Sequence, residues 1–232
     1  MNISKKPNVF VVGDSHAECF KMATKQDDLL LNFVGAAAMP GKSAQGLNKQ
    51  NNLDLCMNRL RLLQEDRIEY LGLLFGEIDC AYTILSRMGR NGTTEEEEMD
   101  FAINGIMKVA RHLSTEKSKR TIILLPIIPL ISDYSKPGIF TTLAQRMQDL
   151  APYKERTNRL LLFNKKLEDQ AIAQGYLVAD INNRLLDLDT GVAKEEYQDN
   201  KAAWHHLGMK NALLFWTEEI VRIVIGEENG IT

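Results

Sequence analysis

Five runs of mainly apolar residues recur along the chain, and helical segments lie between them. The runs cover 9–13, 29–38, 68–76, 120–128 and 176–181. Their apolar residues are largely consecutive, which is typical of strands that are buried on both faces. Strands of this kind, alternating with helices, predict a sheet with helices on both sides. The expected fold class is therefore α/β, a three-layer α/β/α sandwich with a five-stranded parallel sheet.

The segments between these runs have the spacing and the end signals of helices. They cover 16–25, 53–67, 94–113, 156–175 and 209–226. Thr94 and Glu97 are spaced as a capping box. The glutamates at 95–98 would lie at the positive end of the helix dipole, so we interpret them as part of a helix cap and not as an interaction tail. Residues 131–152 show no clear period and are predicted to form an insertion or a lid.

Length, charge and cysteine content narrow the class of protein. The chain has 232 residues and a net charge of −3. That length fits a single domain over 1–232 with a sizeable core. The negative net charge, with no basic cluster among aromatic residues, argues against a nucleic-acid partner. Three cysteines without a CxxC pair are typical of a reducing compartment.

No segment has the length and hydrophobicity of a membrane helix or a signal peptide. The longest apolar run, 121–131, has about half of the roughly 20 residues that a bilayer requires, and it contains prolines. The apolar run near the N-terminus ends at Asp14 and is too short for the core of a signal peptide. We therefore expect a cytoplasmic protein that does not insert into membranes.

Polar residues follow the carboxyl ends of several predicted strands, which is where open parallel sheets bind their ligands. They are Asp14, Ser15 and His16 after the first strand, Gly41, Ser43 and Gly46 after the second, Gly76, Glu77 and Asp79 after the third, and Asp180 and Asn182 after the fifth. Two further histidines, His205 and His206, directly precede the last helix.

Ser15 has the position of a nucleophile. A serine at a strand-to-helix corner has its backbone N–H at the positive end of a helix, where it can donate to a developing oxyanion. Its hydroxyl needs an adjacent base, which His205 or His206 could supply. The alternative is that Asp14 or Ser15 only caps the helix.

Four short blocks along the chain resemble those of a known superfamily. They are Gly13-Asp14-Ser15, the glycine-bearing "PGKSAQGLN" at 40–48, "GEID" at 76–79 and "HHLG" at 205–208. In this order they are similar to the blocks of GDSL/SGNH hydrolases, which are esterases and lipases with a flavodoxin-like three-layer fold. More narrowly, "GDSHAECF", "GKSAQGL" and "LLFGEIDC" resemble a branch associated with carbohydrate modification.

The resemblance implies roles for particular residues. Ser15 would be the nucleophile and, through its N–H, an oxyanion donor. His206 would be the base, with His205 as the alternative, and Gly41 or Ala44 would give the second oxyanion N–H.

The chain also departs from the family pattern. Ile78 replaces the asparagine of the third block, and Ala203 replaces the aspartate three residues before the histidine. Asp199 is then the candidate acid that orients the histidine, with Glu77 or Asp79 as alternatives.

Other residues of the predicted site would contact the substrate or support the site. They are Asp14, His16, Ser43, Gly76, Glu77, Asp79, Trp204 and His205. Glu77 and Asp79 form an acid pair or bind loop amides. Trp204 either packs in the interior or forms a platform for a sugar ring. No cluster has the spacing of a metal site or a cofactor box, so we predict neither.

These residues favour a serine esterase that acts by Ser–His acyl transfer on an acyl ester, such as an acetyl ester, of a carbohydrate. Its partner would be a small-molecule or glycan ester. An O-acyltransferase, or a degenerate protein of the same fold that binds a glycan without turnover, stays open as an alternative. A phosphoacceptor domain built on Asp14 and Asp79 is not favoured, because no lysine closely follows the fifth strand.

Overall fold

Five parallel strands form the centre of the molecule. This computed structural model describes residues 6–24, 31–61, 68–117, 120–132, 151–198 and 207–228. The strands are β1 (Asn8–Gly13), β2 (Asn32–Ala38), β3 (Tyr70–Leu74), β4 (Arg120–Leu124) and β5 (Leu177–Ala179). They pair in the order β2-β1-β3-β4-β5, and every pair is parallel. The predicted parallel sheet is confirmed, and its order reverses between β1 and β3, which is the point where such sheets bind ligands.

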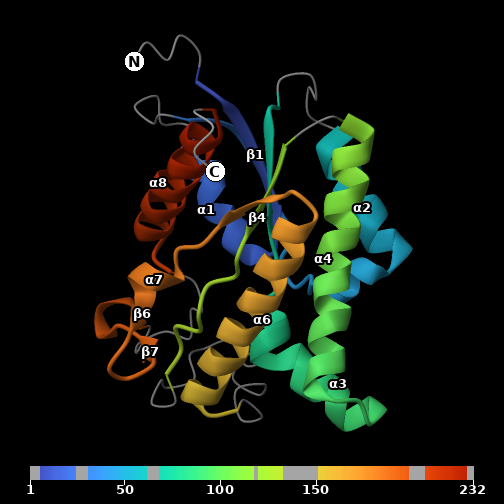
Figure 1. Cartoon of the computed structure of the whole chain (residues 1–232), viewed down its shortest axis with the longest axis vertical. Coiled ribbons are helices and arrows are strands. Elements are labelled where there is room, and N and C mark those ends of the chain that lie inside the picture. The colour runs from blue at the N-terminus through green and yellow to red at the C-terminus, as the bar shows by residue number, and fades with distance from the viewer. Residues whose placement is uncertain are drawn as a thin grey trace.

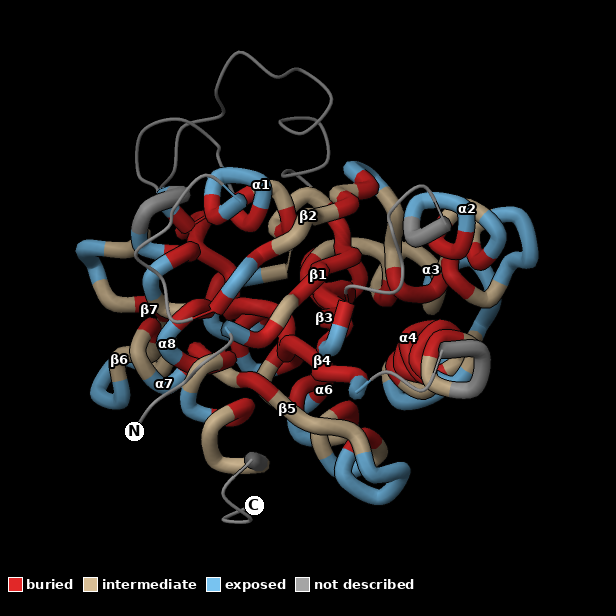
Figure 2. Tube along the Cα trace, turned by 90° about the horizontal axis from the view of Figure 1, so that it is seen from above, coloured by how far each residue is buried: buried red, intermediate tan, exposed pale blue. Residues whose placement is uncertain are grey.

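Helices cover both faces of this sheet. They include η1 (Ser15–Glu18), α1 (Cys19–Ala23), α2 (Gln50–Arg61), α4 (Glu95–Lys117), α6 (Tyr153–Ala173) and α8 (Met209–Glu228). Helix α1 packs against α8, whereas α4 packs against both α2 and α6. Figure 1 shows α1 and α8 on one side of the strands and α2 and α4 on the other, and Figure 2 shows the same division from above. The three-layer sandwich is therefore confirmed.

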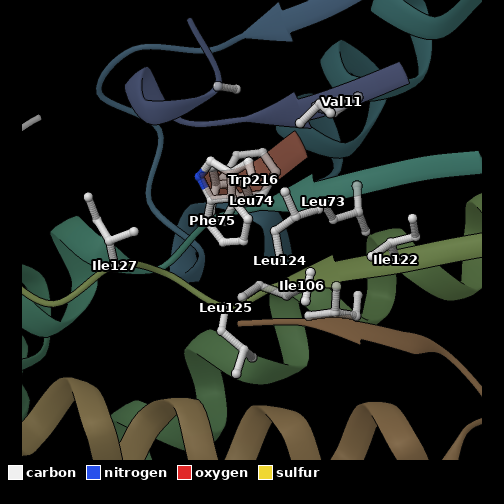
Figure 3. Close-up of a cluster of buried hydrophobic side chains, with 14 of the residues drawn as sticks. Val11, Leu73, Leu74, Phe75, Ile106, Ile122, Leu124, Leu125, Ile127 and Trp216 are labelled. Atoms are coloured by element: carbon white, nitrogen blue, oxygen red, sulfur yellow. The ribbon is translucent and has the colours of Figure 1, made fainter. Parts of the chain in front are cut away.

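Apolar side chains from the sheet and from both helical layers form the core. Val11, Leu73 and Leu124 come from neighbouring strands and are fully buried. Figure 3 shows them with Ile106 of α4 and Trp216 of α8, which are buried from opposite sides. Burying each such side chain stabilises the fold by roughly 1.5–3 kcal/mol. Within the described residues, no helix is both long and apolar enough to cross a bilayer.

The chain after β3 forms helical structure that the sequence pattern did not predict. A π-helical turn, η4 (Asp79–Thr83), leads directly into α3 (Ile84–Asn91). Further short elements that were not predicted are η2 (Gln45–Asn48), α7 (Asn182–Leu185), η5 (Glu195–Tyr197) and the antiparallel pair β6 (Leu186–Asp187) and β7 (Val192–Ala193). Elements this short have too few residues to show a period. Of the predicted insertion or lid, residues 133–150 lie outside the described residues, so it stays a prediction.

The glutamates at the start of α4 do more than cap the helix. The capping box is confirmed, because Thr94 N–H donates to Glu97 (2.8 Å) and Glu97 N–H donates to the Thr94 hydroxyl (3.2 Å). Glu98, however, is 3% exposed and accepts hydrogen bonds from Arg87 (2.7 Å) and from Gln45 (2.8 Å). The interpretation of the run as a helix cap was therefore incomplete, because Glu98 also joins α3 and the loop after β2 to α4.

Candidate active site

Gly13 brings the ends of three strands together at one corner. The backbone carbonyl of Gly13 accepts a hydrogen bond from Met39 N–H (2.8 Å), which follows β2. The next N–H, that of Asp14, donates to the carbonyl of Leu74 (2.9 Å) at the end of β3. A Cβ atom on Gly13 would lie 2.5 Å from that same carbonyl oxygen, so the corner has room only for glycine.

Asp14 caps the short helix that follows the corner. Its Oδ1 atom accepts the backbone N–H of His16 (2.9 Å) and lies 3.1 Å from His16 Nδ1. The capping alternative is therefore confirmed for Asp14, whose side chain is used within the corner itself. Ser15 is the first residue of the helical segment and is not its N-cap.

Ser15 and His16 line a hollow with apolar walls. The described part of its lining comprises Ser15, His16, Glu18, Cys19, Ile127, Leu207, Ala212 and Trp216. Ile127 comes from the loop after β4, and Leu207 lies two residues before the start of α8. Leu207, which lies between the two predicted histidines and the last helix, therefore meets the residues that follow β1 at this hollow.

The loop after β2 begins with a tight turn at Gly41. Lys42 N–H donates to the Met39 carbonyl (3.1 Å), Pro40 precedes the glycine, and Gly41 has φ +73°. These are the features of a type II turn, which requires a positive φ at its third residue. The Ser43 hydroxyl accepts the N–H of Gly46 (3.1 Å), so Ser43 stabilises the same loop. The turn alone accounts for the glycine at 41.

Asp79 fixes the far end of this loop. Its two carboxylate oxygens accept the backbone N–H groups of Ala44 (2.6 Å) and Gln45 (3.1 Å), and the residue is fully buried. Ala44 was a candidate oxyanion donor, and this assignment needs correction: its N–H is already donated to a carboxylate. Of the two alternatives for Asp79, an acid pair or a ligand of loop amides, the geometry favours the second.

Burial raises the pKa of the Asp79 carboxyl to about 7. Loss of hydration is the largest cause and outweighs the two N–H groups, which lower the pKa. The nearby carboxylates of Asp14 and Glu77 raise it further. Ionisation of Asp79 is therefore costly in the folded state, and the carboxyl holds its proton up to about pH 7.

This pKa predicts how stability depends on pH. Between about pH 4 and 7 the folded state holds a proton on Asp79 that the unfolded chain has lost. The stabilisation of the folded state by this proton is therefore fully present below about pH 4, and it is lost as the pH rises through about 7. The free energy of unfolding of the wild type, relative to Asp79→Asn, should therefore fall by up to about 1.4 kcal/mol per pH unit over that range. Denaturant titrations at several pH values measure it. Exposed Asp54→Asn is the control, and a pH-independent difference between wild type and Asp79→Asn would contradict the prediction.

Gly76 and Glu77 are the other predicted site residues that follow the end of β3. Gly76 has φ +125°, and a Cβ there would lie 2.8 Å from the Phe163 ring, so only glycine allows this turn. Glu77 is 6% exposed, and its carboxylate lies near enough to Asp79 to help raise the pKa of that carboxyl. Burial of two neighbouring carboxylates is unfavourable when both are charged.

The remaining predicted site residues lie outside the described part of the chain. They are Asp199, Trp204, His205 and His206, and their roles stay predictions. One relevant residue was missed: a Cβ on Gly105, within α4, would lie 2.1 Å from the Ala44 carbonyl oxygen. An isolated glycine inside a long helical pattern was the signal that could have identified it. No group of three or more metal-ligating side chains occurs within the described ranges.

No family model matches the chain, and no curated protein matches it significantly. Solved structures do match. A candidate acylhydrolase from Bacteroides fragilis has a TM-score of 0.59 at 13% identity, over 96% of this chain and 91% of that one.

Two further solved structures describe the same fold. A GDSL-like lipase from Bacteroides thetaiotaomicron matches with a TM-score of 0.59 at 12% identity, over 97% of this chain and 91% of that one. A variant of an acetyl xylan esterase from Geobacillus stearothermophilus matches with a TM-score of 0.50 at 10% identity, over 97% of both chains. At these identities the likeness concerns the fold, and this chain has the α/β/α fold found in GDSL-like lipases and esterases.

Proposed function

We propose that the protein is a serine esterase of the GDSL/SGNH type, with Ser15 as the nucleophile and His206 as the general base. The main observation in support of the proposal is that Ser15 and Leu207 line the same hollow. His206 directly precedes Leu207 in the sequence, and consecutive Cα atoms are 3.8 Å apart. We therefore propose that the His206 imidazole takes the proton of the Ser15 hydroxyl, while the oxyanion is held by Ser15 N–H and by the turn at Gly41.

The substrate we propose is an acyl ester of a carbohydrate, with acetyl as the simplest acyl group. Support comes from the apolar lining beside Ser15, from the resemblance of the "GEIDC" block to carbohydrate-modifying proteins, and from the fold shared with an acetyl xylan esterase. Reaction of Ser15 with a fluorophosphonate probe, located by peptide mass spectrometry, tests the nucleophile without knowledge of the natural substrate.

A protein of the same fold that binds a glycan without turnover is the second candidate. Ile78 in place of an asparagine, and Ala203 in place of an aspartate, are the observations that favour it. Loss of one oxyanion donor typically lowers the rate by about 10²–10³-fold. Such a protein would bind an acetylated glycan but would neither hydrolyse it nor react with the probe. Transfer of the acyl group to an added sugar, measured against hydrolysis, distinguishes an O-acyltransferase.

Glu77 is the residue that we propose accepts a hydrogen bond from a sugar hydroxyl. The Glu77 carboxylate is 6% exposed and lies near Asp79, so its negative charge costs free energy in the folded protein, and a substrate hydroxyl would give it a donor. We predict that Glu77→Gln raises the free energy of unfolding by about 1 kcal/mol. The same change should lower kcat/KM for an acetylated glycoside by about tenfold, because a neutral amide is a weaker acceptor than a carboxylate.

Thermal or denaturant unfolding and two substrates together test this role. An aryl acetate has no sugar hydroxyls, so its kcat/KM should stay within about threefold of the wild-type value. Exposed Glu155→Gln is the matched control and should change neither stability nor selectivity. A loss of stability in Glu77→Gln, with equal effects on both substrates, would assign Glu77 to packing instead.

A further inference from the structure

The loop after β2 is anchored on both sides of the turn at Gly41. At its start, Met39 N–H donates to the carbonyl of Gly13, one residue from Asp14 and two from Ser15. At its end, the N–H groups of Ala44 and Gln45 donate to Asp79. Residues 40–43 therefore lie between two anchored positions. One is the hydrogen bond to Gly13, just before Ser15, and the other is the pair of hydrogen bonds to Asp79 at the start of η4.

Helix α4 supports the same loop from the opposite side. The Ala44 carbonyl oxygen accepts Leu47 N–H (3.0 Å), and it lies where a Cβ on Gly105 would come within 2.1 Å. Real Cβ atoms do not approach a backbone oxygen so closely, so the absence of a side chain at Gly105 allows this contact. Ala44 is thus held at its N–H by Asp79, and its carbonyl oxygen lies against α4 at Gly105.

Two further contacts join α4 to this loop region. Gln45 Nε2 donates to the Glu98 carboxylate (2.8 Å), and among the described residues the buried Gln45 Oε1 atom has no hydrogen-bond partner. Asn48 Nδ2 donates to the carbonyl of Phe101 (2.7 Å). The loop therefore cannot shift relative to the sheet without breaking contacts to both η4 and α4.

We propose that Asp79 and Gly105 are positioning residues that clamp Ala44, and that this clamp sets the distance between residues 40–43 and Ser15. The inference rests on the proposed function, in which this loop gives the second oxyanion donor. Neither residue touches the substrate. A displacement of about 1 Å in such a group can lower a rate by about 10²-fold, which is why a rigid support would matter.

Two variants disturb the clamp from its two sides. Asp79→Asn keeps the volume of the side chain but leaves only one acceptor for the two N–H groups. Gly105→Ala leaves Asp79 intact and pushes the Ala44 carbonyl away from α4. Gly89→Ala is the matched control, because it is also a helical glycine-to-alanine change and its added Cβ meets nothing within 4 Å.

The experiment counts active sites before it measures their rate. One portion of each protein is titrated with a fluorophosphonate to count the reactive Ser15 sites, at about pH 8, which is about one unit above the Asp79 pKa of about 7. An unlabelled portion is then assayed with an aryl acetate, which gives KM and the kcat per reactive site. We expect kcat per labelled site to fall about 10- to 100-fold in both variants, with KM within about threefold of the wild type, and no change in Gly89→Ala.

Two outcomes would overturn the inference, and they are distinguishable. If both variants lose only thermal stability or labelled sites, with kcat per site unchanged, Asp79 and Gly105 are structural and the esterase proposal stands. If wild-type Ser15 does not react with the probe, the proposed function fails and the clamp fails with it. Should Gly105→Ala not fold, the Asp79→Asn result decides.

Discussion

Replacement of Ser15 by alanine is expected to lower kcat for hydrolysis of an aryl acetate by about 10³- to 10⁶-fold. The acyl-enzyme forms through the Ser15 hydroxyl, so the variant has no atom on which to carry the acyl group. Any residual rate would come from binding and from the N–H donors alone. Initial rates at saturating substrate measure the effect, and labelling by a fluorophosphonate should disappear in the same variant.

Ser114→Ala is the control for this change. Ser114 lies on α4, where its hydroxyl donates to the Ala110 carbonyl (2.8 Å), and we assign it no role in the site. Its activity should equal that of the wild type. If Ser15→Ala hydrolysed the ester at the wild-type rate, the Ser–His mechanism would be wrong and only the fold assignment would remain.

The second large effect is expected for His206→Ala. A serine hydroxyl is a weak nucleophile without a base, so loss of the imidazole should lower kcat by an amount similar to that for Ser15→Ala. The two effects should not add in the double variant, because the residues act as one unit. Rates of the single and double variants, measured with the same aryl acetate, test this.

His205→Ala is the internal comparison for that prediction. It removes a neighbouring imidazole and should keep most of the activity. A large loss in His205→Ala with little loss in His206→Ala would show that the roles are reversed. Asp199→Asn should have a smaller effect than either base variant if Asp199 orients the histidine, since a Ser–His dyad retains part of the activity.

The fold could be predicted from the sequence because its strands are buried on both faces. Continuous apolar runs indicated all five strands, but their ends were less exact. Phe75 is 1% exposed yet lies beyond the β3 ladder, which ends at Leu74. An apolar pattern reports burial and not backbone pairing, so the prediction of 68–76 extended past both ends of the strand.

The contacts within the site were harder to predict, for a physical reason. Asp79 binds backbone amides 34 and 35 residues earlier in the chain, and a backbone N–H leaves no mark in the side-chain pattern. The same holds for Gly105, whose role depends on a carbonyl in another element. The sequence therefore named residues of the corner at Asp14–Ser15 but assigned Ala44 an N–H that was not available.

The corner at Gly13 limits which amino-acid substitutions this protein can accept, in evolution or in a laboratory library. Its carbonyl and the following N–H join three strand ends, and any side chain there would collide with the backbone of β3. In a library that randomises each position in turn, Gly13 should therefore tolerate no substitution at all, although it supplies no chemical group to any reaction. Selection for altered substrates would therefore change residues of the surrounding loops and keep the glycine at 13.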